Sequence, residues 1–206
     1  EMTDANYVEL ARRGYVVLAI DQPDHGDSEV TESFFILQPS GVYQGVLAVS
    51  RMPCVDQEKI GVTGHSMGSW SVNAAIAEDN ASDTQLIAAA LVHCNNPTYM
   101  DEEGNYVNAY GTRPAGVISA VYDEFFGTST DENGNLLSSP YFMETDCAQS
   151  FLHFGADPTE LEDREAYTYY TDTVDGTETF RVIYRPEIIH PWSHFSARSE
   201  SYVIDF

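Results

Sequence analysis

A serine between two glycines is the first feature of this sequence that could do chemistry. Residues 64–68 read Gly-His-Ser-Met-Gly, after the apolar run 59–63 and before the small-residue run 69–78. On a tight turn from a strand into a helix, such a serine exposes its hydroxyl as a nucleophile. The flanking glycines leave room for the turn, and the Met67 N–H faces a developing oxyanion. This context predicts Ser66 as the nucleophile and Met67 as an oxyanion-hole donor, with an idle serine on an ordinary turn as the alternative.

A serine hydroxyl is a weak nucleophile unless a histidine takes its proton and a carboxylate orients that histidine. In a strand–turn–helix arrangement of this kind, the chain order is serine, acid, histidine. Asp123 follows the apolar run 117–121, and its neighbour Glu124 is the second candidate acid. Two histidines, His190 and His194, follow the last apolar run. We favour His190 as the base because its distance from that run is the usual one, and we keep His194 as the alternative.

The remaining histidines and the cysteines predict no further chemistry. We expect His65, inside the serine turn, to be structural, and His93 and His153 to be ordinary satisfied histidines. The three cysteines are far apart in the sequence and form no C-x-x-C pair: Cys54, Cys94 and Cys147. A thiolate zinc site is therefore not expected, and the predicted chemistry requires neither a metal nor a cofactor.

The charge of the chain excludes some classes of partner. There are 33 acidic residues against nine lysines and arginines, giving a formal net charge of −24. Such a surface repels nucleic acid and anionic lipid. No apolar run reaches the 18 or so residues needed to span a bilayer, so we expect no membrane insertion by this segment. The expected partner is a small acyl substrate, while oligomeric state and cellular location stay open.

Apolar runs alternate with helical patterns around these residues. The strand-like runs are 15–20, 59–63, 86–92, 117–121 and 180–184, and the helical patterns are 3–13, 39–52, 69–78 and 196–206. This alternation predicts an α/β fold, a mostly parallel sheet with helices on both faces, in a single domain over residues 1–206. Run 15–20 is continuous and β-branched, which predicts a strand buried on both faces. Polar stretches 95–114 and 127–139 follow strands, so each could shape the mouth of a site or be a plain loop.

Two stretches resemble the α/β-hydrolase superfamily. Residues 21–28, with Asp21 and His25-Gly26-Asp27-Ser28, look like its D-x-x-G-H-G-x-S run, with Asp24 where glycine is usual. Residues 55–68 are similar to the serine turn of its dienelactone-hydrolase-like and acetyl-esterase-like branches. The resemblance implies an α/β-hydrolase fold and cleavage of carboxylic esters. Amide or thioester cleavage, acyl transfer, and a non-catalytic binding module on the same scaffold are the alternatives.

The resemblance also implies a part that these 206 residues do not contain. Members of the superfamily begin with further strands, and a loop after one of them supplies the second oxyanion donor. We therefore expect the chain to lack those strands, and the second donor to lie upstream of Glu1. Losing one such donor costs about 2.7–4 kcal/mol of transition-state stabilisation. Residues 1–206 alone should then be weakly active or inactive toward esters, while a longer chain should be active. An upstream signal or membrane anchor stays open.

Overall fold

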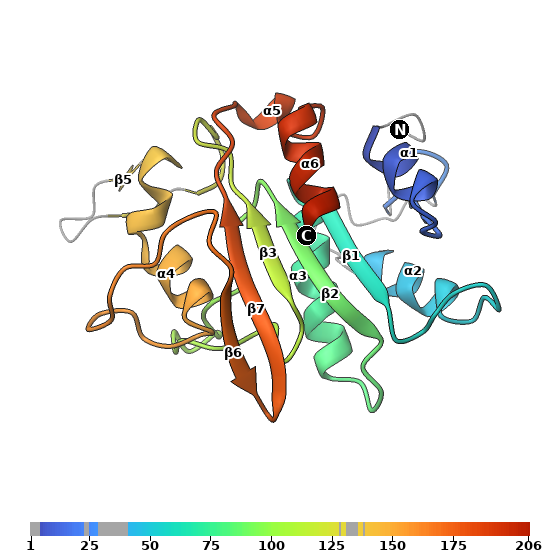
Figure 1. Cartoon of the computed structure of the whole chain (residues 1–206), viewed down its shortest axis with the longest axis horizontal. Coiled ribbons are helices and arrows are strands. Elements are labelled where there is room, and N and C mark those ends of the chain that lie inside the picture. Colours follow the sequence, from blue (N-terminus) through green and yellow to red (C-terminus); the bar gives the residue numbers. More distant parts are fainter. Residues whose placement is uncertain (1–4, 23–24, 29–40, 128, 131–135, 138) are drawn as a thin grey trace.

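The computed structural model describes residues 5–22, 25–28, 41–127, 129–130, 136–137 and 139–206. Its centre is a five-stranded sheet in the order β1-β2-β3-β7-β6 (Figure 1). The strands are β1 (Ile60–His65), β2 (Ile87–His93), β3 (Ala115–Ile118), β6 (Tyr170–Val174) and β7 (Thr177–Tyr184). The first four in the sheet order are parallel, and β6 runs antiparallel to β7. The predicted α/β class with a mostly parallel sheet is confirmed.

Helices pack on both faces of this sheet. The helical segments are α1 (Ala5–Arg12), α2 (Gly41–Val49), α3 (Met67–Asn80), η1 (Ser139–Glu144), α4 (Asp146–Leu152), α5 (His190–Ser193) and α6 (Ala197–Asp205). One apolar cluster joins the sheet to α2, α3 and α4, and a second joins the opposite face to α6. Figure 1 shows α3 behind the strands and α6 in front of them. A short two-stranded ribbon, β4 (Ser129–Thr130) with β5 (Leu136–Leu137), lies apart from the main sheet.

The central strands are apolar on both sides because both sides are covered. Val92 and Val117 are fully buried in the cluster under α3, while Ile118 is fully buried in the cluster under α6. Gly116 makes room for the C-terminal helix, since a Cβ there would lie 3.0 Å from the ring of Phe206. The helix predicted over 196–206 is confirmed as α6, Ala197–Asp205, and the predicted apolar side packs on the second cluster through Tyr202, Val203 and Phe206.

The prediction of a buried strand at 15–20 is wrong. These residues form no strand, and the side chains of Tyr15, Val16 and Leu18 are 63%, 52% and 46% exposed. Strand formation needs a neighbouring backbone about 4.8 Å away, and residue composition alone does not supply one. Side chains of Leu18 and Ile20 instead lie beside α2, since a Cβ at Gly45 would be 3.5 Å from each.

The hairpin formed by β6 and β7 was not predicted. Asp175 and Gly176 connect the two strands with φ of 48° and 81°, which is the backbone of a type I′ turn. The Asp-Gly pair is a recognised signal for such a turn. The residues of β6, however, are mostly polar and exposed, so this strand has no apolar run by which the sequence could reveal it. The consequence is an antiparallel edge on an otherwise parallel sheet.

The helices in the described part of the chain are short. The longest is α3, with 14 residues. None of the described helices is long and apolar enough to cross a membrane.

Candidate active site

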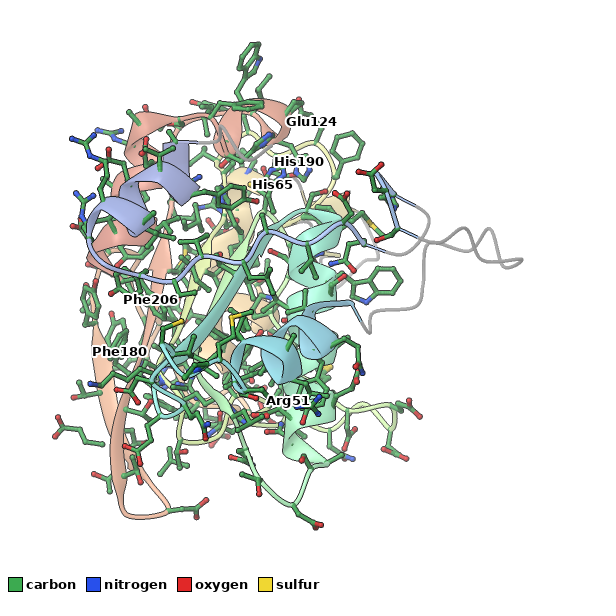
Figure 2. The ribbon with its side chains drawn as sticks, turned by 90° about the vertical axis from the view of Figure 1, so that its right-hand side faces the viewer. Arg51, His65, Glu124, Phe180, His190 and Phe206 are labelled. Atoms are coloured by element: carbon green, nitrogen blue, oxygen red, sulfur yellow. The ribbon has the colours of Figure 1, made fainter. Side chains whose placement is uncertain are left out.

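Ser66, Asp123 and His190 each follow a strand of the parallel sheet at its carboxyl end. Ser66 comes directly after β1, Asp123 five residues after β3, and His190 six residues after β7. Parallel strands present their carboxyl ends at one edge, where α/β proteins bind ligands. Figure 2 shows His65, His190 and Glu124 together at one end of the molecule, with Arg51 toward the other end.

The segments that carry the acid and the histidine are paired beyond the ends of their strands. Three backbone hydrogen bonds continue the β3–β7 pairing: Ser119 N–H to Tyr184 O (2.9 Å), Val121 N–H to Pro186 O (2.8 Å) and Tyr122 N–H to Ile188 O (3.1 Å). Tyr122 and Ile189 form an isolated parallel bridge at the end of this ladder. Asp123 and His190 are the next residues on each side, so the register of the two strands brings them together.

Ser66, His190 and Asp123 form an unbroken chain of hydrogen bonds. His190 Nε2 lies 2.8 Å from Ser66 Oγ, and His190 Nδ1 lies 2.8 Å from Asp123 Oδ2. A neutral imidazole with its proton on Nδ1 fits both contacts, donating to the carboxylate and accepting from the hydroxyl. The side chains of His190 and Asp123 are 8% and 1% exposed, so water competes little for the contact between them.

The two candidate acids make different contacts with the histidine. Asp123 bonds the ring through Oδ2, while its Oδ1 accepts the backbone N–H groups of Phe125 and Phe126, each at 2.9 Å. Glu124 accepts the backbone N–H of His190 at 3.0 Å. The carboxylate on the imidazole is therefore that of Asp123, and Glu124 fixes the main chain that holds the ring.

The turn around Ser66 is strained. Ser66 has φ 58° and ψ −118°, a conformation that residues with a side chain rarely adopt. A Cβ on Gly64 would lie 2.6 Å from the backbone carbonyl of Gly68, whereas a Cβ on Gly68 would meet none of the described residues within 4 Å. The expectation that both glycines are needed for space is therefore wrong for Gly68, because no described residue lies in its Cβ direction.

Backbone and amide contacts hold this turn in place. Ser66 N–H donates to His93 O at 2.8 Å, and Asn95 Nδ2 donates to Ser66 O at 2.9 Å. Met67 is the first residue of α3, where amide N–H groups have no acceptor within the helix. Asn95 begins the polar stretch 95–114 and lies two residues after the end of β2, at the ligand-binding edge, and its hydrogen bond to Ser66 O makes it part of the candidate site.

His65 supports the main chain of the candidate base. Its Nε2 donates to His190 O at 3.1 Å, and its ring centroid lies 4.7 Å from that of His190 and 4.3 Å from that of His194. Burial, with smaller contributions from His194 and His190, lowers the pKa of His65 to about 4. A neutral His65 therefore packs under His190 and fixes its carbonyl. His194 contacts His65 and Phe195 through its ring, with centroid separations of 4.3 Å and 3.9 Å.

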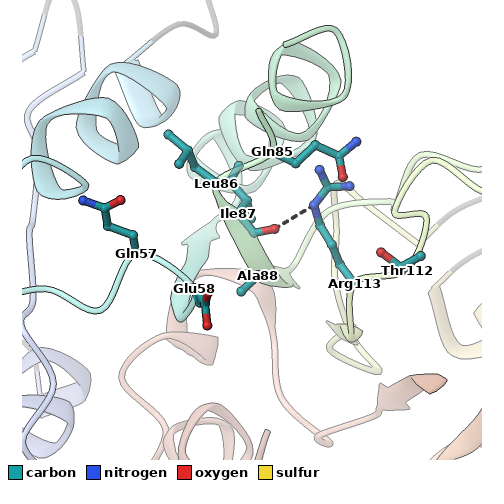
Figure 3. Close-up of a pocket in the computed structure, with 8 residues that line it drawn as sticks. All are labelled: Gln57, Glu58, Gln85, Leu86, Ile87, Ala88, Thr112 and Arg113. Atoms are coloured by element: carbon teal, nitrogen blue, oxygen red, sulfur yellow. Dashed lines mark hydrogen bonds between the residues drawn. The ribbon is translucent and has the colours of Figure 1, made fainter. Parts of the chain in front are cut away.

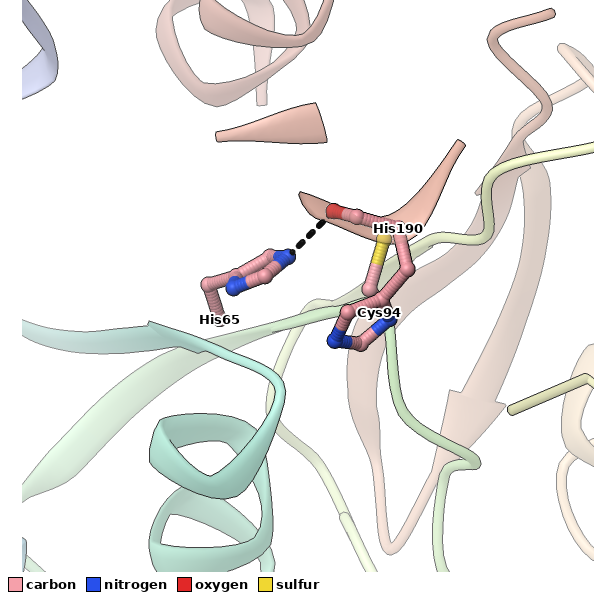
Figure 4. Close-up of side chains that lie close together, drawn as sticks. All are labelled: His65, Cys94 and His190. Atoms are coloured by element: carbon pink, nitrogen blue, oxygen red, sulfur yellow. Dashed lines mark hydrogen bonds between the residues drawn. The ribbon is translucent and has the colours of Figure 1, made fainter. Parts of the chain in front are cut away.

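Among the described residues, one group of side chains that could together bind a metal ion lies at the candidate site and consists of His65, Cys94 and His190. Their ligand atoms lie within 4.8 Å of one another (Figure 4). Both ring nitrogens of His190 and the Nε2 of His65 already take part in hydrogen bonds, and burial raises the pKa of the Cys94 thiol to about 12. We therefore assign this cluster no metal.

The side chains of His93 and His153 each hydrogen-bond to another part of the protein, away from Ser66. His93 Nε2 lies 2.7 Å from the buried Ser193 Oγ, and burial holds the His93 pKa well below its usual value. His153 lies at the end of α4 and donates to Glu162 O at 3.0 Å. All three cysteines are free thiols.

A depression of about 280 Å³ lies at the opposite edge of the sheet (Figure 3). Arg113 lines it and donates to Ile87 O at 2.8 Å, at the start of β2. The same guanidinium pairs with the fully buried Asp79 at 2.6 Å. Because its charge is already matched inside the protein, Arg113 is a structural residue and not an anion-binding one.

Comparison of the chain with protein-family models, with curated proteins and with solved structures finds no match.

Proposed function

We propose that this protein is a serine hydrolase of the α/β-hydrolase type that cleaves carboxylic-ester bonds through an acyl-enzyme. The observation that carries the proposal is the hydrogen-bonded chain from Ser66 through His190 to Asp123, with both contacts at 2.8 Å. These three residue types, in this order of contact, are the ones that turn a hydroxyl into a nucleophile.

In the proposed reaction, His190 Nε2 takes the proton from Ser66 Oγ as the oxygen attacks the acyl carbon. The carbonyl oxygen becomes an oxyanion, which the Met67 N–H at the start of α3 stabilises. When the tetrahedral intermediate collapses, the ester C–O bond breaks and the alcohol leaves with the proton held by His190. Asp123 keeps the proton on Nδ1 and stabilises the imidazolium while it exists.

The second half of the reaction repeats these roles with water. His190 removes a proton from water, the hydroxide attacks the acyl-serine, and the acid leaves as Ser66 Oγ regains its proton. Every proton in the cycle is held by substrate, water, Ser66 or His190. Ser66 and His190 therefore account for the proton transfers that the cycle requires of the protein.

The conformation of Ser66 supports catalysis over a purely binding role. A non-glycine residue at φ 58° and ψ −118° costs on the order of 1–3 kcal/mol. Strain of this kind persists where it serves a mechanism, here by lifting the hydroxyl toward His190.

A fluorophosphonate probe tests the nucleophile directly. We expect the probe to label the protein at Ser66, and labelling to disappear in Ser66→Ala. Ser201→Ala, which removes an exposed hydroxyl on α6, is the matched control and should label as the wild type does. Labelling that persists in Ser66→Ala would refute the assignment.

The base is tested by comparing two histidine variants. His190→Ala should reduce the labelling rate by at least about 10³-fold, because the residual reactivity of a triad without its base is that small. His194→Ala removes a ring that contacts His65 and Phe195, and should retain most of the rate. The reverse ranking would assign the base to His194.

A further inference from the structure

Large apolar side chains are exposed on the two segments that hold His190 and its acid. Phe125, Trp192 and Phe195 are 66%, 61% and 66% exposed, and Tyr122 is 53% exposed. A soluble surface rarely leaves several large aromatic side chains exposed in one place unless they bind something. We call Phe125, Trp192 and Phe195 the aromatic rim.

The aromatic rim is continuous across the candidate base. A chain of ring contacts runs from one end of it to the other, with the following centroid separations: Phe125–His190 5.0 Å, His190–His65 4.7 Å, His65–His194 4.3 Å, His194–Phe195 3.9 Å and Phe195–Trp192 6.3 Å. Phe126 also faces His190, at 5.5 Å. An apolar group lying along the rim would thus start beside the ring that receives the Ser66 proton.

The charges around the rim select against anionic ligands. Segments 119–127 and 186–196 contain no lysine or arginine, and they contribute Asp123, Glu124 and Glu187. The chain as a whole carries a formal charge of −24. On these two segments a ligand with a carboxylate or phosphate would find no cation to pair with, and their acidic side chains would repel it.

We propose that the aromatic rim binds the apolar acyl chain of an uncharged ester, so that medium-length acyl chains are preferred over acetyl. This inference rests on the proposed function, because it places the acyl group next to Ser66 and His190. Each methylene that leaves water on these rings adds favourable binding free energy. Because the rim is open and not enclosed, the gain per methylene is smaller than in a buried pocket.

A chain-length series tests the preference. We expect kcat/KM for p-nitrophenyl octanoate to exceed that for the acetate by about tenfold or more, both below the micellar concentration. In a Trp192→Ser/Phe195→Ser double variant, this ratio should fall toward unity. Leu161→Ser, which removes a 42% exposed apolar side chain from the loop between α4 and β6, should keep the wild-type ratio. An octanoate-to-acetate ratio near unity in the wild type would overturn the inference while leaving ester hydrolysis intact.

Binding without turnover separates the rim from the chemistry. In Ser66→Ala, the uncharged ketone 2-decanone should shift the fluorescence of Trp192 to shorter wavelength in a saturable way, and the anion decanoate should bind more weakly. The variant Trp192→Phe measures the background fluorescence of Trp70. The double variant Phe125→Ser/Phe195→Ser should bind 2-decanone more weakly. A ketone shift without hydrolysis of any ester would refute the proposed function and support the rim. The absence of any ketone shift would refute the rim.

Discussion

The two glycines that flank Ser66 predict opposite effects of the same substitution. A Cβ on Gly64 would lie 2.6 Å from the carbonyl carbon and oxygen of Gly68 and 3.1 Å from its Cα. These are backbone atoms, so no rotamer change can relieve the overlap. A Cβ on Gly68 would meet nothing within 4 Å in the part of the chain that the structure describes. Gly64→Ala should therefore destabilise the protein, whereas Gly68→Ala should not.

The size of the difference follows from these distances. An ordinary contact begins near 3.4 Å, so the turn must open by about 0.8 Å, which is 3.4 minus 2.6 Å, to accept Gly64→Ala. Overpacking of this kind costs about 2–3 kcal/mol. Gly68 lies in the first turn of α3, where alanine gains up to about 1 kcal/mol over glycine. The two variants should differ by about 3 kcal/mol.

Urea unfolding followed by circular dichroism measures this difference. With a slope of about 2 kcal/mol per molar urea, the two midpoints should lie about 1.5 M apart, on opposite sides of the wild type. Gly64→Ala should also slow fluorophosphonate labelling by about 100-fold, because a shift near 1 Å at a reacting atom has that effect. Equal destabilisation by the two variants, or a larger loss in Gly68→Ala, would refute the steric reasoning.

The strain at Ser66 predicts that Ser66→Gly is more stable than Ser66→Ala by about 1–2 kcal/mol in the same unfolding assay, because glycine accepts φ 58° freely; equal stabilities would argue against strain. Asp123→Asn should lower kcat for an ester by about 10³–10⁴-fold, whereas Glu124→Gln should stay within about threefold, since an amide oxygen still accepts the His190 N–H; a larger loss in Glu124→Gln would reassign the acid. Burial lowers the pKa of His65 from 6.5 to about 4, so between these pH values the unfolded chain binds a proton that the folded chain does not, and stability falls as pH falls. A pKa difference of this size corresponds to about 3 kcal/mol, which partial exposure reduces to about 1–2 kcal/mol; His65→Gln should remove that part of the decline, measured by urea unfolding at pH 7 and pH 4.5.

Local sequence patterns predicted most elements near the site but placed some of their ends incorrectly. The strands predicted at 59–63 and 86–92 correspond to β1 and β2, and the helix predicted at 69–78 begins two residues earlier, at Met67. β3 ends at Ile118, three residues before the predicted end at residue 121. Residues 119–122 keep their hydrogen bonds to the segment after β7 without forming a regular strand. The apolar run thus predicted which residues pair with the neighbouring segment, but not the residue at which the regular β-strand ends.

Amino-acid composition fails to predict strands in two opposite ways, as run 15–20 and β6 show. The run has the apolar residues of a central strand, and yet Tyr15 is 63% exposed and the segment forms no strand. β6 has mostly exposed side chains and pairs along its whole length with β7. A strand exists only where another backbone is in register with it, and that partner is a property of the folded chain.

The sequence by itself determined the elements whose causes are local. The Gly-His-Ser-Met-Gly turn, the apolar alternation and the chain order of Ser66, the acids and the histidines can all be read from side chains a few residues apart. Only the tertiary structure decided which histidine contacts Ser66 and which acid contacts that histidine. Asp123 and His190 are 67 residues apart, and the parallel register of β3 and β7 brings these two side chains within 2.8 Å. A shift of one residue in that register would present Glu124 or Ile189 instead, because neighbouring residues on an extended chain point in opposite directions.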